Sequence, residues 1–234
     1  MEALRLSFYQ QTACFKKPLA MKVRETYPLP PYSTVKGLVH ALLRADRLIP
    51  LQLSIQGTHE ALVQDYQTHV FFKQRDVSEY ALTTAGLDAQ PDTPHITRMP
   101  LYTQLLFDLH LTLHVAAAPS ILDVLEQAVL APDEFLSLGR REDLVRVDEC
   151  RRVRVGAIAP EESLVLPQDA YIPEALLPPD VGRIPMQLNW TYTVKDSVRE
   201  WTKVPVGYVR AWSRLQGSGL RRDDAGCPVF FWPL

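Results

Sequence analysis

Two histidines in one β-prone segment are the first side chains of this 234-residue chain that suggest chemistry. His110 and His114 alternate with apolar residues in residues 105–116, and Asp108 falls on the same side of the predicted strand. Two imidazoles and a carboxylate can hold a metal ion or move protons. However, positions i and i+4 of a strand lie roughly 13 Å apart at about 3.3 Å per residue, which one ion cannot bridge. Polar residues on the open face of a sheet are the simpler interpretation, and we expect no metal, cofactor or catalytic residue.

The motifs of nucleophilic and nucleotide chemistry are missing from the sequence. Ser33 is not part of a G-x-S-x-G elbow. Neither G-x-x-x-x-G-K-[ST] nor G-x-G-x-x-G occurs. Cys14, Cys150 and Cys227 are odd in number and far apart, which argues against a disulfide framework and against a zinc site of the C-x-x-C kind.

The segment 27–43, YPLPPYSTVKGLVHALL, could hold an anion. Its prolines favour a stiff, extended approach, after which Ser33 or Thr34 sits where a helix N-cap belongs. The predicted helix then begins with hydroxyls, free backbone N–H groups and Lys36, which together suit a phosphate. Gly37 would let a ligand or another backbone come close. An ordinary proline-led helix start explains the same pattern and is the simpler interpretation of this segment alone.

Charge is unevenly distributed along the chain, although the formal net charge is only −2. Residues 1–50 carry eight Lys and Arg against three Asp and Glu. Residues 140–154 hold a second basic group, which acidic residues dilute, so its default interpretation is a solvated mixed-charge face. Aromatic residues lie among the N-terminal basic residues, and this combination suits single-stranded RNA through stacking and phosphate contacts. Packing in the core or at an edge accounts for many of these aromatic residues equally well.

Apolar periodicity predicts an α+β fold. We expect strands at residues 3–10, 51–57, 105–116 and 147–158. One helix follows the prolines, and a second begins at Ser120, which would form a capping box with Asp123. With a projecting excursion, this order is the β-α-β-β-α-β pattern of a ferredoxin-like (RRM-like) domain, which we place at residues 1–158.

Two regions depart from this pattern. Residues 69–100 contain two β segments and a turn-rich stretch, which indicates a projecting hairpin. Residues 159–182 contain five prolines and are typical of a linker or a long surface connection. β-prone stretches follow, so we expect a β-rich C-terminal extension at residues 159–234. The N-terminal residues lack the apolar core of a signal peptide and no apolar run could span a bilayer, so we expect a cytoplasmic protein without a membrane partner.

Two motifs, read together, resemble a known family. The first is PPYSTVKGL at residues 30–38, which follows CFKKP at residues 14–18; the second is LGRRED at residues 138–143. The chain resembles the CRISPR-associated Cas5 family of the RAMP superfamily, and its type I-B branch best. The resemblance in the order of strands and helices covers residues 1–156, and the tail matches only in being β-rich.

The resemblance implies a non-catalytic subunit of Cascade, the RNA-guided DNA surveillance complex of antiviral defence. Family members hold the five-prime handle of the crRNA, cap the filament of backbone subunits, and lie beside the large subunit that reads the PAM on target DNA. They use a ferredoxin-like domain with a β-hairpin thumb, here about residues 69–100. In such ribonucleoproteins base pairing reads sequence while protein grips backbone and shape. The RNA-binding residues implied here are Lys16, Lys17, Tyr32, Ser33, Thr34, Lys36, Gly37, Arg140 and Arg141.

One branch of the family, type I-C, also cuts precursor crRNA with a Tyr/Lys/His group. That group cannot be placed in this sequence, because His110 and His114 lack an adjacent lysine and the nearest tyrosine, Tyr102, is a strand-length away. A metal-independent endoribonuclease that processes precursor crRNA is therefore the alternative function. A plain protein-interaction module with a ferredoxin-like core is a third interpretation, which the two motifs disfavour.

Overall fold

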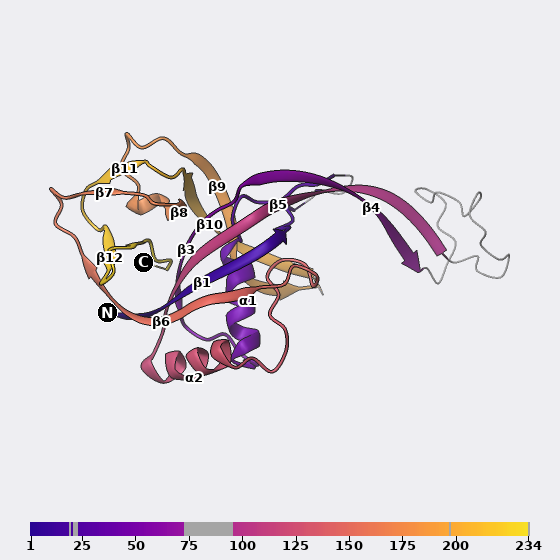
Figure 1. Cartoon of the computed structure of the whole chain (residues 1–234), viewed down its shortest axis with the longest axis horizontal. Coiled ribbons are helices and arrows are strands. Elements are labelled where there is room, and N and C mark those ends of the chain that lie inside the picture. Colours follow the sequence, from indigo (N-terminus) through magenta and orange to yellow (C-terminus); the bar gives the residue numbers. More distant parts are fainter. Residues whose placement is uncertain (19, 21–22, 73–95, 197, 234) are drawn as a thin grey trace.

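A computed structural model describes residues 1–18, 20, 23–72, 96–196 and 198–233. The chain forms a largely antiparallel sheet with two helices packed beneath one part of it (Figure 1). This arrangement confirms the predicted α+β class. Within the described residues, neither helix is long and apolar enough to cross a membrane.

Four strands form the part of the sheet that covers the helices. They are β1 (Glu2–Ala13), β3 (Gln52–Thr58), β5 (Ile96–Ala116) and β6 (Arg146–Ala157). Their order is β6-β1-β5-β3, and each neighbouring pair is antiparallel. Apolar side chains alternate into the core along β1 and β5, as in Leu4, Leu6 and Phe8, because successive side chains of a strand point to opposite faces. The four predicted strands are confirmed.

Helix α1 (Tyr32–Leu42) connects β1 to β3, and α2 (Pro119–Leu130) connects β5 to β6. Each buries one apolar stripe, with Val35 and Val39 in α1 and Leu122 and Leu125 in α2. The predicted N-caps are wrong. Pro31 and Ala118 occupy the N-cap positions with extended backbone and no side-chain cap, so each helix begins before the Ser and Thr residues expected to cap it.

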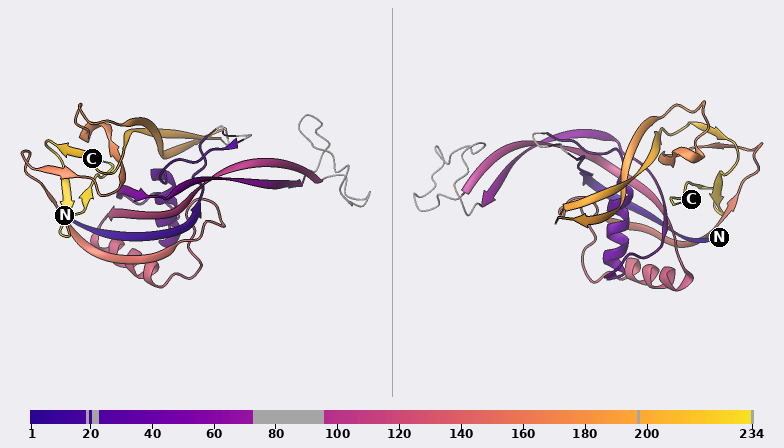
Figure 2. Two further views of the ribbon diagram at one scale, coloured as in Figure 1. Left: turned by 45° about the horizontal axis from the view of Figure 1, so that its top comes forward. Right: turned by 180° about the vertical axis from the view of Figure 1, so that it is seen from behind.

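A long ribbon projects from this body (Figures 1 and 2). Strand β4 (Ala61–Phe72) pairs with the N-terminal half of β5, from Ala61↔Phe107 to Phe72↔Ile96. Asp108 lies where the ribbon leaves the main sheet and has a left-handed φ of 54°, a conformation that Asp tolerates better than most residues. Most of the predicted excursion, residues 73–95, lies outside the described residues. Both chain termini lie at the end of the molecule opposite the ribbon.

The C-terminal residues extend the same sheet. Strand β8 (Asp169–Pro173) lies between β3 and β10 (Val198–Val209), and β9 (Ile184–Lys195) is the outermost strand. Every residue of β8 is buried, so the linker interpretation of residues 159–182 is wrong for this segment. Its proline closes the strand instead of breaking it. The boundary at residues 158/159 stays a prediction, and the sheet continues across it.

Short elements complete the C-terminal part. The strands β7 (Ser163–Val165) and β11 (Arg214–Gln216) pair with each other. The turn before β9 contains the 3-10 helix η1 (Glu174–Leu176). At the β6 edge of the main sheet, β12 (Arg221–Asp223) pairs with β6 and with β13 (Pro228–Val229). Elsewhere, the short strand β2 (Val23–Arg24) pairs with β5 in parallel.

A buried ionic network fastens the C-terminal turn to the central strands. Asp223 accepts hydrogen bonds from Arg5 of β1 (2.9 Å), from His114 of β5 (3.2 Å) and from the amide of Cys227 (2.8 Å). Arg5 also binds Glu149 of β6 (2.9 Å). His114 is fully buried, so its predicted place on an open sheet face is wrong: residues more than a hundred positions away cover it. The network therefore joins β1, β5 and β6 to Asp223, the last residue of β12, and to the turn at residues 224–227 that follows it.

Asp223→Asn should lower the free energy of unfolding by about 2–3 kcal/mol, because hydrogen bonds to charged groups contribute about that much and Arg5 loses a buried counter-charge. Urea unfolding at neutral pH measures the effect. Asp224→Asn is the matched control, since the exposed pair of Asp224 with Arg151 contributes about 1 kcal/mol or less. Equal midpoints for the two variants would contradict a structural role of the network.

The stability of the protein should also fall with acid in a way that depends on Asp223. Burial opposes ionisation of this carboxyl, but hydrogen bonds from His114, Cys227 and Arg5 hold its pKa well below the usual range. A group with a depressed folded-state pKa contributes its full stabilisation above the unfolded pKa of about 4 and loses it as the pH falls further. The difference in melting temperature between wild type and Asp223→Asn should therefore be largest above about pH 5 and should shrink progressively as the pH falls below about 4. A gap that widens with acid would contradict this assignment.

Candidate functional site

The N-terminus of α1 faces the interior of the protein. Tyr32 is fully buried and packs edge-on against Trp190, with its ring centroid 6.4 Å from that of Tyr171. Burial alone raises the pKa of the Tyr32 hydroxyl. Tyr32 therefore has no exposed surface to offer RNA, which corrects its place in the predicted binding set. Ser33 and Thr34 are half-buried and Gly37 is exposed, so the surface of the helix begins one turn further on.

Lys36 supports the fold instead of extending into solvent. Its Nζ donates to the carbonyl of Trp190 and lies 4.6 Å from the Trp190 ring centroid. Trp190 lies at an irregularity of β9, because the register moves from Asn189↔Lys203 to Thr191↔Thr202 with no partner for Trp190. Desolvation lowers the pKa of Lys36. Lys36 thus ties α1 to the irregular part of β9.

The second family motif, residues 138–143, forms a loop around a buried carboxylate. Asp143 accepts from the amide of Cys14 (2.9 Å), from the amide of Arg140 (2.8 Å) and from the Arg140 guanidinium (2.7 Å). Gln10 donates to two carbonyls of the loop at 2.9 Å. Gly139 has a φ of 111°, and a Cβ there would lie 2.8 Å from Asp143 Oδ2, so this position requires glycine. The motif joins the loop to the end of β1.

The predicted basic residues near this loop therefore have different roles. Arg140 is half-buried and bound by Asp143 and Glu142, so it holds the loop rather than flanking a ligand. Arg141 and Lys16 are exposed. Lys17 forms a surface ion pair with Glu25 at 3.2 Å. The arginines of β6 are mainly paired with acidic side chains, as the mixed-charge interpretation predicts.

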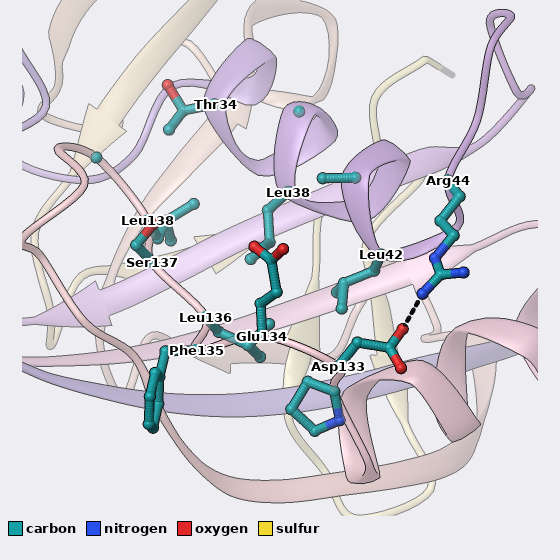
Figure 3. A pocket seen from close by; sticks show the side chains of 14 residues that line it. Thr34, Leu38, Leu42, Arg44, Asp133, Glu134, Phe135, Leu136, Ser137 and Leu138 are labelled. Carbon is teal, nitrogen blue, oxygen red and sulfur yellow. Dashed lines mark hydrogen bonds and ion pairs between the residues drawn. The ribbon is translucent and has the colours of Figure 1, made fainter.

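One pocket brings the two family motifs to the same surface (Figure 3). This loop pocket, of about 500 Å³, lies between α1 and residues 132–139, and both Thr34 and Gly139 line it. Its charged side chains are Asp133, Glu134 and Arg44, and the last is already paired with Asp133. Phe135 also lines this pocket and is 93% exposed. The loop pocket is thus weakly acidic.

A second pocket lies on the other side of α1, against the hairpin formed by β9 and β10. This hairpin pocket has a volume of about 510 Å³. Ser33, Lys36 and Gly37 line it from the helix. Gly37 also lines the loop pocket, and an added Cβ there would meet no atom within 4 Å among the described residues beyond its own turn of helix. Gly37 therefore marks the ridge between the two pockets.

A polar cluster lies on the sheet face where the ribbon begins. The register places Tyr9 opposite His110, with ring centroids 5.0 Å apart. Arg146 lies 4.3 Å over the Tyr9 ring, and His110 is 3.7 Å from Asp108. Hydrogen bonding to Asp108, followed by desolvation, raises the pKa of Tyr9. Sequence reasoning missed the Tyr9–His110 pair because only strand pairing brings β1 and β5 together.

One buried group has ligand atoms close enough together for a metal ion. Ligand atoms of His114, Asp223 and Cys227 lie within 4.8 Å of one another. However, Asp223 already accepts bonds from protein donors, and the Arg5 guanidinium 2.9 Å away would repel a cation. Burial raises the pKa of the Cys227 thiol to about 11, which disfavours the thiolate that metals prefer. These residues suit a hydrogen-bond network better than a metal site.

The fold is similar to that of chains in solved structures whose titles name CRISPR complexes or proteins. The fold matches a chain from a structure titled "CRISPR RNA-guided surveillance complex", with a TM-score of 0.53 and 17% identity over 93% of this chain and 94% of the other. It also matches a CRISPR protein from Archaeoglobus fulgidus, with a TM-score of 0.51 and 12% identity over 98% of both chains. No curated protein matches this sequence. At these identities the likeness concerns the fold.

The sequence itself provides the stronger assignment. Residues 3–211 match the model of the family described as CRISPR-associated protein (Cas_Cas5). That match includes both motifs, α1, the ribbon and most of the C-terminal strands. The chain therefore belongs to the CRISPR-associated Cas5 family.

Proposed function

We propose that this protein is a non-catalytic subunit of a type I Cascade complex, of the I-B branch, which binds the five-prime handle of the crRNA and caps the backbone filament in antiviral defence. The observation that carries the proposal is the family match over residues 3–211, whose two motifs meet at the loop pocket. The large subunit and target DNA near the PAM would lie beside it. RNA-guided complexes divide labour in this way, because protein grips the RNA backbone while base pairing reads sequence.

The arrangement of the sheet supports a ferredoxin-like core. The strand order β6-β1-β5-β3, with a helix after β1 and another after β5, fits the β-α-β-β-α-β pattern. We assign the β4–β5 ribbon as the thumb and residues 159–234 as the C-terminal extension. Leu62, Tyr66 and Tyr102 of the ribbon are each more than half exposed. Apolar side chains gathered on a projecting element suit contacts with neighbouring backbone subunits.

The handle would cross the surface where α1 and the loop of residues 138–143 meet. Lys16 and Arg141 provide exposed cations for its phosphates, and Ser33 and Thr34 provide hydroxyls. Lys17 would contribute if RNA displaced Glu25. Cations of this kind make binding salt-dependent, because each neutralised phosphate releases counterions. Lys36 and Arg140 would act indirectly, by holding the helix and the loop in place.

Reversing the charge of the two exposed cations should weaken RNA binding without unfolding the protein. The double variant Lys16→Glu/Arg141→Glu should bind labelled repeat RNA at least about ten-fold more weakly at low salt, and its affinity should depend less on salt. Fluorescence anisotropy across a salt series measures both effects. Arg221→Glu/Arg214→Glu, on exposed residues of β12 and β11, is the matched control. Equal losses in the two double variants would indicate non-specific attraction and contradict the proposed path.

Endoribonuclease activity on precursor crRNA is the second candidate function, and the Tyr9–His110 pair favours it. Metal-independent cleavage of RNA requires groups that take a proton from the 2′-hydroxyl and give one to the leaving oxygen. About half of the His110 side chain is exposed, and His110 lies beside Tyr9 and Arg146 on an open face of the sheet. Against this candidate, Arg146 is already bound to Asp148 at 2.6 Å. The pair therefore warrants a direct test.

The purified protein should bind repeat RNA in EDTA without cutting it, and His110→Ala and Tyr9→Phe should leave the RNA pattern on a denaturing gel unchanged. A discrete product that disappears in either variant would replace the non-catalytic assignment with the nuclease. His59→Ala, which removes a histidine that does not pair with Tyr9, is the control. A product made by a contaminating nuclease would persist in all three variants.

A further inference from the structure

We propose that the hairpin pocket binds one unstacked base of single-stranded RNA, with Tyr192 and Trp201 as the stacking surface and Arg199 as a phosphate contact. The inference rests on the proposed function, because it adds a base-binding site to the handle-binding surface. It concerns residues of the C-terminal extension that neither family motif contains. The hairpin pocket shares Ser33 with that surface, and Lys36 and Gly37 of α1 line it as well.

The aromatic pair lies on a part of the hairpin that does not belong to the core. Tyr192 and Trp201 are direct cross-strand partners, with ring centroids 5.1 Å apart and an interplanar angle of 60°. Tyr192 is 44% exposed, and both rings line the pocket. Two large rings on an exposed part of the β9–β10 hairpin add little apolar burial to the core. Stacking of an RNA base on an aromatic ring, in contrast, contributes about 1–3 kcal/mol per base. The pocket volume of about 510 Å³ is within the usual range for small-ligand sites.

The cations and aromatic rings of the hairpin pocket together favour an anionic, aromatic ligand. Arg199 is exposed, and its guanidinium carbon lies 4.5 Å over the Tyr192 ring. Arg47 also lines the pocket, against one carboxylate, Asp46, and Lys36 adds a further charge although its Nζ is bound to the Trp190 carbonyl. The loop pocket has the opposite balance, with two carboxylates and one arginine. Of the loop pocket and the hairpin pocket, only the latter therefore combines aromatic faces with excess positive charge, which is the composition that binds single-stranded nucleic acid.

The walls of this pocket are fixed before any ligand arrives. Lys36 ties the helix to the irregular strand at Trp190, which positions the hairpin. On the other side, His40 holds the chain that follows α1: its Nδ1 lies 2.9 Å from the carbonyl of Lys36, and its Nε2 accepts from the amide of Ile49 at 3.0 Å. Because these walls are pre-organised, little ordering would be required when a base enters.

The experiment measures binding of fluorescein-labelled repeat RNA to the full chain by anisotropy, with an RNA of the same length in which a run of bases is replaced by abasic sites. Trp201→Leu should weaken binding of the intact RNA by about ten-fold and binding of the abasic RNA far less, since it removes a stacking surface. Arg199→Gln should weaken both by several-fold; because Arg199 is exposed, this variant also keeps the test valid if Trp201→Leu fails to fold. Trp212→Leu, at an 81% exposed tryptophan outside the pocket, is the control and should bind like wild type.

The outcomes separate this inference from the proposed function. If Lys16→Glu/Arg141→Glu weakens binding but Trp201→Leu and Arg199→Gln do not, the hairpin pocket holds no RNA and the proposed function stands. If Trp201→Leu weakens binding of intact and abasic RNA equally, the residue does not stack on a base, and the pocket is better explained as a contact for a protein subunit. If the wild-type chain binds neither RNA, both proposals are wrong. Photocrosslinking of 4-thiouridine RNA to Tyr192 or Trp201 would support the base site directly.

Discussion

The buried carboxylate of Asp143 is the interaction on which the candidate surface depends. It receives the amide of Cys14 from the end of β1 and both the amide and the guanidinium of Arg140 from its own loop. A charge in that position is stable only while these donors remain, since an unpaired buried charge costs several kcal/mol. The carboxylate thus fixes the loop against the segment that leads to Lys16. Without it, neither family motif would have a defined position relative to the other.

Several basic side chains elsewhere in the fold are likewise held by carboxylates or carbonyls, so they contribute to the structure and not to a binding surface. Arg5 is bound by Glu149 and Asp223, Arg140 by Asp143, and Lys36 by a backbone carbonyl. These cations support the structure and are largely unavailable to a ligand. Exposed cations remain on the surfaces proposed for RNA: Lys16 and Arg141 beside the two family motifs, and Arg199 at the hairpin pocket. A near-neutral chain can therefore still present a locally positive surface to RNA.

Sequence periodicity predicted the elements well, and tertiary partners decided where it failed. Alternation located β1, β3, β5 and β6, because half-buried strands alternate with period two. Alternation says which face a residue shares, but not what covers that face, so His114 was assigned to solvent although Asp223 covers it. β8 was missed because prolines suggested a linker. The motifs located the loop and α1 correctly, but the tertiary contacts of Lys36 and Arg140, which hold the helix and the loop, have no local sequence signal. The Tyr192–Trp201 pair required the hairpin register, which no local pattern provides.

Gly37 lies on α1 between the loop pocket and the hairpin pocket. A glycine within a helix costs about 0.5–1 kcal/mol relative to alanine, and here an added Cβ would meet nothing within 4 Å among the described residues. The fold of the chain therefore gives no reason for the glycine, while the position lies on the ridge between an acidic pocket and a cationic, aromatic one. Under the proposed function, a side chain at this ridge would obstruct whatever crosses from one pocket to the other. Under that proposal, the exposed ridge of α1 is where the bound RNA or a neighbouring subunit would contact the helix.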